Sequence, residues 1–178
     1  MKLHIGCGKK YLSGYKHIDV IDYDHIDFVS DARELNVIAN ESVSEIYACH
    51  ILEHVARNDV LGVLKEWGRV LQSGATLRIA VPDFEAVVGE YIENRNLMSF
   101  QGLLYGGQTY DYNFHHVAFD YKMIKNLLEE SGFCEVQRYD WQDFLPTEGF
   151  DDYSRSYLPH MDFENGRLMS LNVIATKK

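Results

Sequence analysis

Short apolar runs alternate with amphipathic stretches along most of this chain. Between residues 58 and 72 the apolar side chains recur at steps of three and four, which predicts an amphipathic helix. The same spacing predicts helices after Asp83 and after Asp120, two aspartates placed to cap them. The β-prone runs lie at residues 2–5, 17–20, 27–31, 44–49, 76–81, 134–141 and 171–176.

This alternation predicts an α/β fold with a doubly wound, mostly parallel seven-stranded sheet covered on both faces. The turn signal Asn165-Gly166 precedes the final run, so we expect the last strand to return antiparallel. Residues 9–15 lack helical periodicity. The first crossover helix is therefore expected to be short or missing.

Two stretches, near residues 94–118 and 142–167, show little regular periodicity. Loops of this length are uncommon in compact domains and often cover a binding site. We therefore expect a single domain spanning residues 1–178, in which these two segments cover a substrate.

Composition narrows the possible partners. At 178 residues and 46% hydrophobic content the chain can bury one core without metals or disulfides. Its net charge of −10, with no clustered basic residues, argues against nucleic acid or an anionic membrane as a partner. Three widely spaced cysteines predict free thiols. With a strand expected from Lys2 and no run long enough to span a bilayer, we expect a cytoplasmic protein without a signal peptide.

A Gly-x-Gly turn closes the first predicted strand at Gly6, Cys7 and Gly8. Such a turn presents backbone N–H groups and lets a ligand approach the main chain closely. Asp19 ends the second predicted strand, where a carboxylate can accept two hydrogen bonds from a ribose diol. A solvated turn aspartate is the alternative for Asp19.

The third predicted strand ends at Asp31, followed by Ala32. The carboxylate can accept a hydrogen bond from an adenine amine, and the Ala32 N–H can reach the ring. A local cap for a turn through residues 32–35 explains Asp31 equally well.

Residues 50–54 spell His-x-x-Glu-His, which matches a zinc motif letter for letter. That motif needs both histidines on one helical face and a further ligand from elsewhere. Here it falls at a strand-to-helix junction, so His50 and His54 are not expected to share a face. We therefore expect no metal site.

His115 and His116 lie in a loop rich in tyrosine and glycine. An imidazole there can act as general base toward a substrate hydroxyl or carboxyl. The alternative is that each histidine only packs or forms structural hydrogen bonds.

Four segments together resemble the class I S-adenosylmethionine-dependent methyltransferases: residues 3–8, 50–55, 68–83 and 127–133. The segment from Gly68 to Asp83 is the most specific match. The chain also resembles, more weakly, a small bacterial group linked to cell-surface polysaccharide synthesis. The resemblance implies a Rossmann-like methyltransferase fold and methyl transfer from S-adenosylmethionine to a small-molecule or glycan acceptor.

The resemblance also implies where the cofactor lies. The glycine turn would lie under its methionine moiety, Asp19 would hold the ribose, and His50 would approach the methionine end. The implied cofactor-binding residues are His4, Gly6, Cys7, Gly8, Asp19, Asp31, Ala32 and His50.

Some features depart from the family pattern. His4 stands where an acidic residue is common, and Lys10 stands where a third glycine is often found. Asp19 follows Gly8 by 11 residues, whereas the dinucleotide fingerprint expects about 20 between its glycines and the acid. Two alternatives remain open: an NAD-type oxidoreductase, and a non-catalytic protein that binds an adenosyl or nucleotide ligand.

Overall fold

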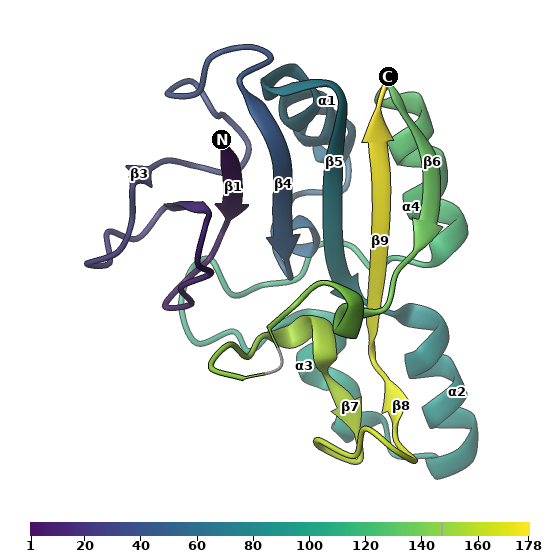
Figure 1. Cartoon of the computed structure of the whole chain (residues 1–178). Coiled ribbons are helices and arrows are strands. Elements are labelled where there is room, and N and C mark those ends of the chain that lie inside the picture. Colours follow the sequence, from purple (N-terminus) through teal and green to yellow (C-terminus); the bar gives the residue numbers. More distant parts are fainter. Residues whose placement is uncertain (147) are drawn as a thin grey trace.

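The computed structural model describes residues 1–146 and 148–178 and is built on one mixed sheet. Seven strands follow the order β3-β2-β1-β4-β5-β9-β6 across this sheet (Figure 1). Their bounds are Lys2–Ile5 (β1), Lys16–Asp19 (β2), Phe28–Val29 (β3), Val43–Cys49 (β4), Leu71–Pro82 (β5), Phe133–Arg138 (β6) and Ser170–Lys177 (β9).

Strands β1 to β5 pair in parallel, whereas β9 runs antiparallel to both of its neighbours, β5 and β6. The last strand is antiparallel, as the sequence predicts, and it lies between β5 and β6. The carboxyl ends of the parallel strands meet at one edge of the sheet, which Figure 1 shows at the bottom.

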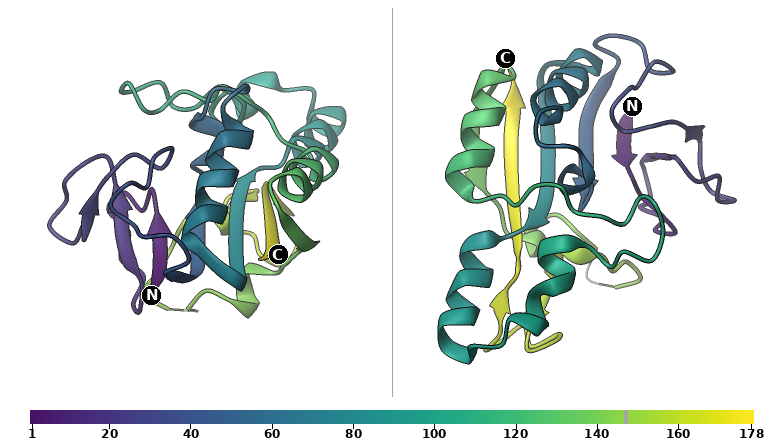
Figure 2. Two further views of the ribbon diagram at one scale, coloured as in Figure 1. Left: turned by 90° about the horizontal axis from the view of Figure 1, so that it is seen from above. Right: turned by 180° about the vertical axis from the view of Figure 1, so that it is seen from behind.

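Helices cover one face of the sheet. Helix α1 (Val60–Val70) and helix α4 (Tyr121–Glu130) lie side by side there, as the view from behind in Figure 2 shows. Their apolar stripes join alternate strand residues in the main core, where Trp67 and Ile124 are fully buried. Asp120 caps α4 by accepting a hydrogen bond from the Met123 N–H at 2.7 Å, as expected.

The opposite face carries no helix longer than one turn in the described residues, so the doubly wound prediction is only partly met. The segment after β6 covers this face instead and packs Trp141, Leu145 and Phe150 against Tyr47 of β4. It contains the short helices η3 (Trp141–Asp143) and η4 (Tyr153–Arg155). Aromatic side chains thus supply the apolar cover that a second helical layer would otherwise provide.

A second small layer lies beyond the carboxyl edge of the sheet (Figure 1). It consists of α2 (Phe84–Asn94), η2 (Leu97–Phe100), α3 (Gln101–Tyr105) and the β7–β8 hairpin (Tyr157–Leu158 and Arg167–Leu168). Ala86, Val87, Phe100 and Met169 form its own apolar cluster. Both segments predicted to cover a substrate contribute to this layer.

No helix joins β1 to β2: residues 6–15 form turns, as the missing periodicity predicts. The structure differs from the prediction in several element boundaries. Helix α1 ends at Val70 rather than Gln72, and Gly74, at φ +78°, lies in a register irregularity within β5. Strand β6 ends at Arg138, so Trp141 belongs to η3, and residues 97–105 form short helices.

Among the described residues, none of the helices combines the length and the apolar character needed to cross a bilayer.

Candidate functional site

A cleft of about 970 Å³ opens at the carboxyl edge of the sheet. It brings together all ten site residues named from the sequence. These are His4, Gly6, Cys7, Gly8, Asp19, Asp31, Ala32, His50, His115 and His116. The convergence follows from the parallel strands, because their carboxyl ends deliver consecutive loops to the same place.

The glycine turn after β1 forms one wall of the cleft. Gly6 and Gly8 have φ angles of +62° and +55°, in the region that glycine adopts without strain. A Cβ atom on Gly6 would collide with the Ile51 side chain, whereas a Cβ atom on Gly8 would meet no atom within 4 Å. Gly6 is therefore needed for packing, and Gly8, which lines the cleft, has open space beside it.

Asp19 ties this turn to the end of β2. Its Oδ2 accepts a hydrogen bond from the Gly8 N–H at 2.8 Å, and its Oδ1 accepts one from the Ile21 N–H at 2.9 Å. The side chain is thus part of the turn itself rather than a freely solvated carboxylate. Each oxygen retains a second lone pair for a further donor.

Asp31 follows β3, the strand beside β2, and carries out the local role given as its alternative. Its Oδ1 accepts hydrogen bonds from the Arg33 N–H at 2.8 Å and from Arg33 Nε at 2.9 Å. The guanidinium also lowers the pKa of the Asp31 carboxyl, chiefly through this side-chain hydrogen bonding. Asp31 is therefore ionised and already paired.

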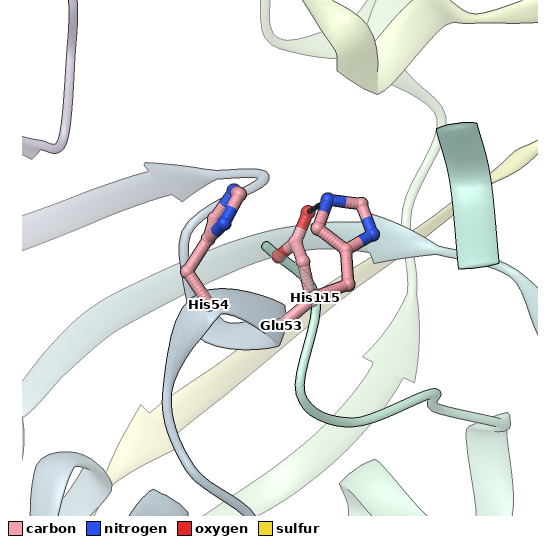
Figure 3. A group of neighbouring side chains, drawn as sticks. All are labelled: Glu53, His54 and His115. Carbon is pink, nitrogen blue, oxygen red and sulfur yellow. Dashed lines mark ion pairs between the residues drawn. The ribbon is translucent and has the colours of Figure 1, made fainter. Parts of the chain in front are cut away.

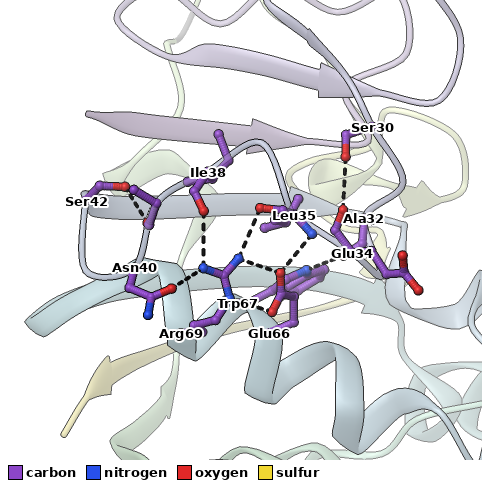
Figure 4. Close-up of polar contacts among 11 residues, drawn as sticks. Ser30, Ala32, Glu34, Leu35, Ile38, Asn40, Ser42, Glu66, Trp67 and Arg69 are labelled. Carbon is purple, nitrogen blue, oxygen red and sulfur yellow. Dashed lines mark hydrogen bonds and ion pairs between the residues drawn. The ribbon is translucent and has the colours of Figure 1, made fainter.

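The backbone after Asp31 is held by helix α1 (Figure 4). Trp67 Nε1 donates to the Ala32 carbonyl at 2.8 Å, and the Leu35 N–H donates to Glu66 at 2.9 Å. Arg69 pairs with Glu66 and donates to the Leu35 carbonyl at 3.1 Å. A segment without regular structure is thereby fixed beside the cleft.

His4 is buried and faces the aromatic side of the sheet, with its ring centroid 5.2 Å from that of Tyr47. Burial, with His17 and His25 nearby, lowers its pKa to about 3, so the imidazole is neutral. Cys7 is a free thiol whose pKa burial raises to about 12, which makes it a poor nucleophile.

A cluster of three histidines surrounds Glu53 next to the glycine turn. His50 directly follows β4, Glu53 and His54 lie in η1 (Leu52–His54), and His115 reaches in from the loop after α3. Glu53 Oε1 lies 3.3 Å from His50 Nδ1 and 3.9 Å from His115 Nε2. Figure 3 shows Glu53 and His115 facing each other, with His54 beside them.

Burial shifts the pKa values in this cluster in opposite directions. It raises the pKa of Glu53 to about 8, because the carboxyl is fully buried. It lowers the pKa of His50 to about 3 and that of His54 to about 4, and it also lowers the pKa of His115. All three imidazoles are therefore neutral near pH 7.

The two loop histidines differ in their surroundings. His115 Nδ1 donates to the Leu103 carbonyl at 2.9 Å, so its ring is held in place. The His116 side chain is exposed, and its backbone N–H donates to the Glu53 carbonyl at 2.8 Å. Of the two imidazoles, that of His115 approaches the Glu53 carboxyl group.

The sequence did not predict that Glu53 lies among the three histidines, or that Tyr153 lines the cleft. Tyr153 lies with its ring centroid 5.3 Å from that of His50 and is 67% exposed along the cleft. The signal for Glu53 was the His-x-x-Glu-His pattern, but nothing in that pattern shows that the carboxyl is buried. No comparable signal marked Tyr153.

Comparison with solved structures finds the same architecture elsewhere. An S-adenosylmethionine-dependent methyltransferase from Archaeoglobus fulgidus superposes with a TM-score of 0.59 and 16% identity, covering 99% of this chain and 85% of that one. One from Methanosarcina mazei gives 0.58 and 18%, covering 99% and 91%. The fold is that of S-adenosylmethionine-dependent methyltransferases. No protein-family model and no curated protein sequence matches the chain.

A third similar structure with this methyltransferase fold contains ligands. It is the 1,6-didemethyltoxoflavin-N1-methyltransferase of Burkholderia thailandensis, with bound 1,6-didemethyltoxoflavin and S-adenosylhomocysteine. The TM-score is 0.61 at 12% identity, and the match covers 99% of this chain and 70% of that one.

Proposed function

We propose that residues 1–178 act as one domain that transfers a methyl group from S-adenosylmethionine to a small-molecule or saccharide acceptor. The observation that carries this proposal is the Gly6–Gly8 turn, held open by Asp19 at the carboxyl edge of a methyltransferase-like sheet. The similar structures support it, since a neighbour with the same architecture holds S-adenosylhomocysteine.

In this proposal the cofactor follows the wall from the glycine turn to Ala32. Its methionine moiety lies over Gly6, Cys7 and Gly8, and Gly8 leaves open space there. The ribose hydroxyls donate to the remaining lone pairs of Asp19. The adenine reaches the Ala32 N–H, and its amine donates to the ionised Asp31.

The other end of the cofactor points toward the histidine cluster. His50, at the end of β4, lies beside the methionine end, which brings the methyl group toward the loop at residues 106–118. His4 packs beneath the turn as a neutral ring. Because it carries no negative charge, it supports the turn without pairing with the cofactor's amino group.

The reaction is an in-line displacement. A lone pair on the acceptor forms a bond to the methyl carbon while the carbon–sulfur bond breaks. That electron pair stays on sulfur and leaves S-adenosylhomocysteine. If the acceptor is a hydroxyl, its proton passes to a loop imidazole, and His115 and His116 both line the cleft. Most of the rate enhancement comes from holding donor and acceptor in contact.

Aromatic side chains along the cleft indicate the chemistry of the acceptor. Tyr110, Tyr112, Phe114 and Tyr153 line it and are 39% to 67% exposed. Rings of this kind stack on sugars, phenols and heterocycles. They belong to the two segments near 94–118 and 142–167, which we assign to covering the acceptor.

Calorimetry with the purified protein tests this function. We expect one site per chain for S-adenosylmethionine and for S-adenosylhomocysteine, and no comparable heat with NAD. Stronger binding of NAD would favour an oxidoreductase and contradict the proposal. Cofactor binding without methyl transfer to a panel of sugars, phenols and heterocycles would reduce the protein to a non-catalytic binder.

A further inference from the structure

Glu53 has no hydrogen-bond donor in the part of the chain that the structure describes. The side chain is fully buried, and both carboxylate oxygens lack a partner. A buried carboxylate without a donor is costly, by several kcal/mol for an ion without compensation. The groups around Glu53 must therefore show how the cost of burying this carboxyl is offset.

None of the three imidazoles around Glu53 donates a hydrogen bond to it. His115 Nδ1 lies 2.9 Å from the Leu103 carbonyl, which only accepts, so Nδ1 carries the hydrogen and Nε2 presents a lone pair. His54 Nδ1 lies 3.1 Å from the Phe114 carbonyl, which leaves the lone pair on its Nε2 by the same logic.

A relay of hydrogen bonds determines the tautomer of His50. Asn172 Nδ2 donates to the Ser154 carbonyl at 2.8 Å, and the Ser170 hydroxyl donates to Asn172 Oδ1 at 2.9 Å. Ser170 Oγ, at 3.2 Å from His50 Nε2, then accepts the ring hydrogen. His50 Nδ1 therefore turns a lone pair toward Glu53 Oε1, 3.3 Å away.

Imidazole lone pairs thus face the Glu53 carboxylate, to which no group of the described residues donates a hydrogen bond. Lone pairs facing one another repel unless a proton or a metal cation lies between them. One ligand atom from each of Glu53, His54 and His115 lies within 4.8 Å of the others. Ligands about 2.0–2.2 Å from a tetrahedral ion are about 3.4 Å apart, so a small closure of the side chains would complete the set.

We propose that Glu53, His54 and His115 bind a divalent transition-metal ion at the inner end of the cleft. Two imidazoles and one carboxylate suit ions such as Zn²⁺, Co²⁺ and Mn²⁺. The backbone carbonyls of Leu103 and Phe114 orient the two rings, in the way that outer partners orient histidine ligands. This revises the expectation of no metal, because the missing ligand comes from the distant loop.

Three protein ligands leave a coordination position open, as in catalytic metal sites. His54 and His115 line the cleft, so the open position faces the space assigned to the acceptor. This part of the inference rests on the proposed methyl transfer: the ion would bind an acceptor with an oxygen donor and ease loss of its proton. His116 would then remain as the loop imidazole free to receive that proton.

Titration of chelator-treated protein with Co²⁺ tests the site, with visible absorption as the readout and Zn²⁺ competition as a second measurement. We expect one ion per chain in the wild type. Glu53→Gln, His54→Ala and His115→Ala should each weaken binding by about 100-fold or more. His160→Ala, which removes an exposed imidazole outside the cluster, should leave the affinity unchanged.

Absence of Co²⁺ and Zn²⁺ binding by folded wild-type protein would overturn the site, and Glu53 would then hold a proton instead. Ligand variants that bind Co²⁺ like the wild type would overturn it as well. Thermal unfolding of each variant without metal shows whether it is folded. S-adenosylhomocysteine binding is measured on the same samples, so failure of the metal site and failure of the cofactor site are distinguished.

Discussion

The Gly8 backbone N–H donates a hydrogen bond to Asp19 Oδ2 at 2.8 Å, which joins the turn after β1 to the end of β2. No helix lies between these two strands, so this contact fixes the glycine turn against the end of β2. The same carboxylate faces the cleft. Structure and proposed ligand binding therefore depend on one side chain.

Asp19→Ala should lose both roles. The N–H groups of Gly8 and Ile21 lose their acceptor, which should lower the free energy of unfolding by about 1–3 kcal/mol. Binding of S-adenosylhomocysteine should fall below detection. Urea unfolding and calorimetry measure the two effects. Asp22→Ala removes the same charge from an exposed position nearby and should match the wild type in both; equal losses in the two variants would contradict the role of Asp19.

Gly8→Val should abolish cofactor binding. The new side chain would project into open space that the account assigns to the methionine moiety. Gly14→Val is the control for the backbone strain that valine introduces at φ +55°. Gly14 has φ +86° and also has open space around it, but it does not line the cleft. Both variants should lose stability, but only Gly8→Val should fail to bind S-adenosylhomocysteine in calorimetry. Wild-type affinity in Gly8→Val would refute the placement.

His4 should make the protein less stable in acid. Its folded pKa, about 3, lies below the ordinary value of 6.5, because of burial and of the neighbouring His17 and His25. The unfolded chain therefore binds the proton first, and stability falls as the pH drops from about 6.5 toward 3, by up to about 1.4 kcal/mol per pH unit.

His4→Phe keeps a ring beside Tyr47 but removes this proton uptake. Urea unfolding between pH 7 and pH 5 should show a shallower loss of stability in the variant than in the wild type. Identical slopes would mean that His4 does not take part in acid unfolding.

Local patterns predicted most of the sheet and the long helices. The apolar spacing of α1 and α4 and the caps Asp83 and Asp120 are encoded within a few residues, so they were confirmed. The helix predicted up to residue 72 ends two residues earlier, because Leu71 already pairs with Val43 of the neighbouring strand β4. Trp141 was assigned to β6 because its burial in a cluster with Tyr47, Leu145 and Phe150 is a tertiary feature.

The candidate site was predicted as a set of residues but not as a geometry. Parallel strands made the convergence of Gly8, Asp19 and His50 foreseeable. The contact between Glu53 and His115 could not be foreseen, because it joins residues 62 positions apart through a loop without periodicity. Burial of Glu53 likewise arises from packing that no local pattern records.

Calorimetric titration of the purified protein with S-adenosylhomocysteine tests whether the cleft binds an adenosyl cofactor. We predict saturable binding with one site per chain, displaced by S-adenosylmethionine and lost in Gly8→Val but retained in Gly14→Val. Absence of binding of either compound to folded wild-type protein, or preferential binding of NAD, would contradict it.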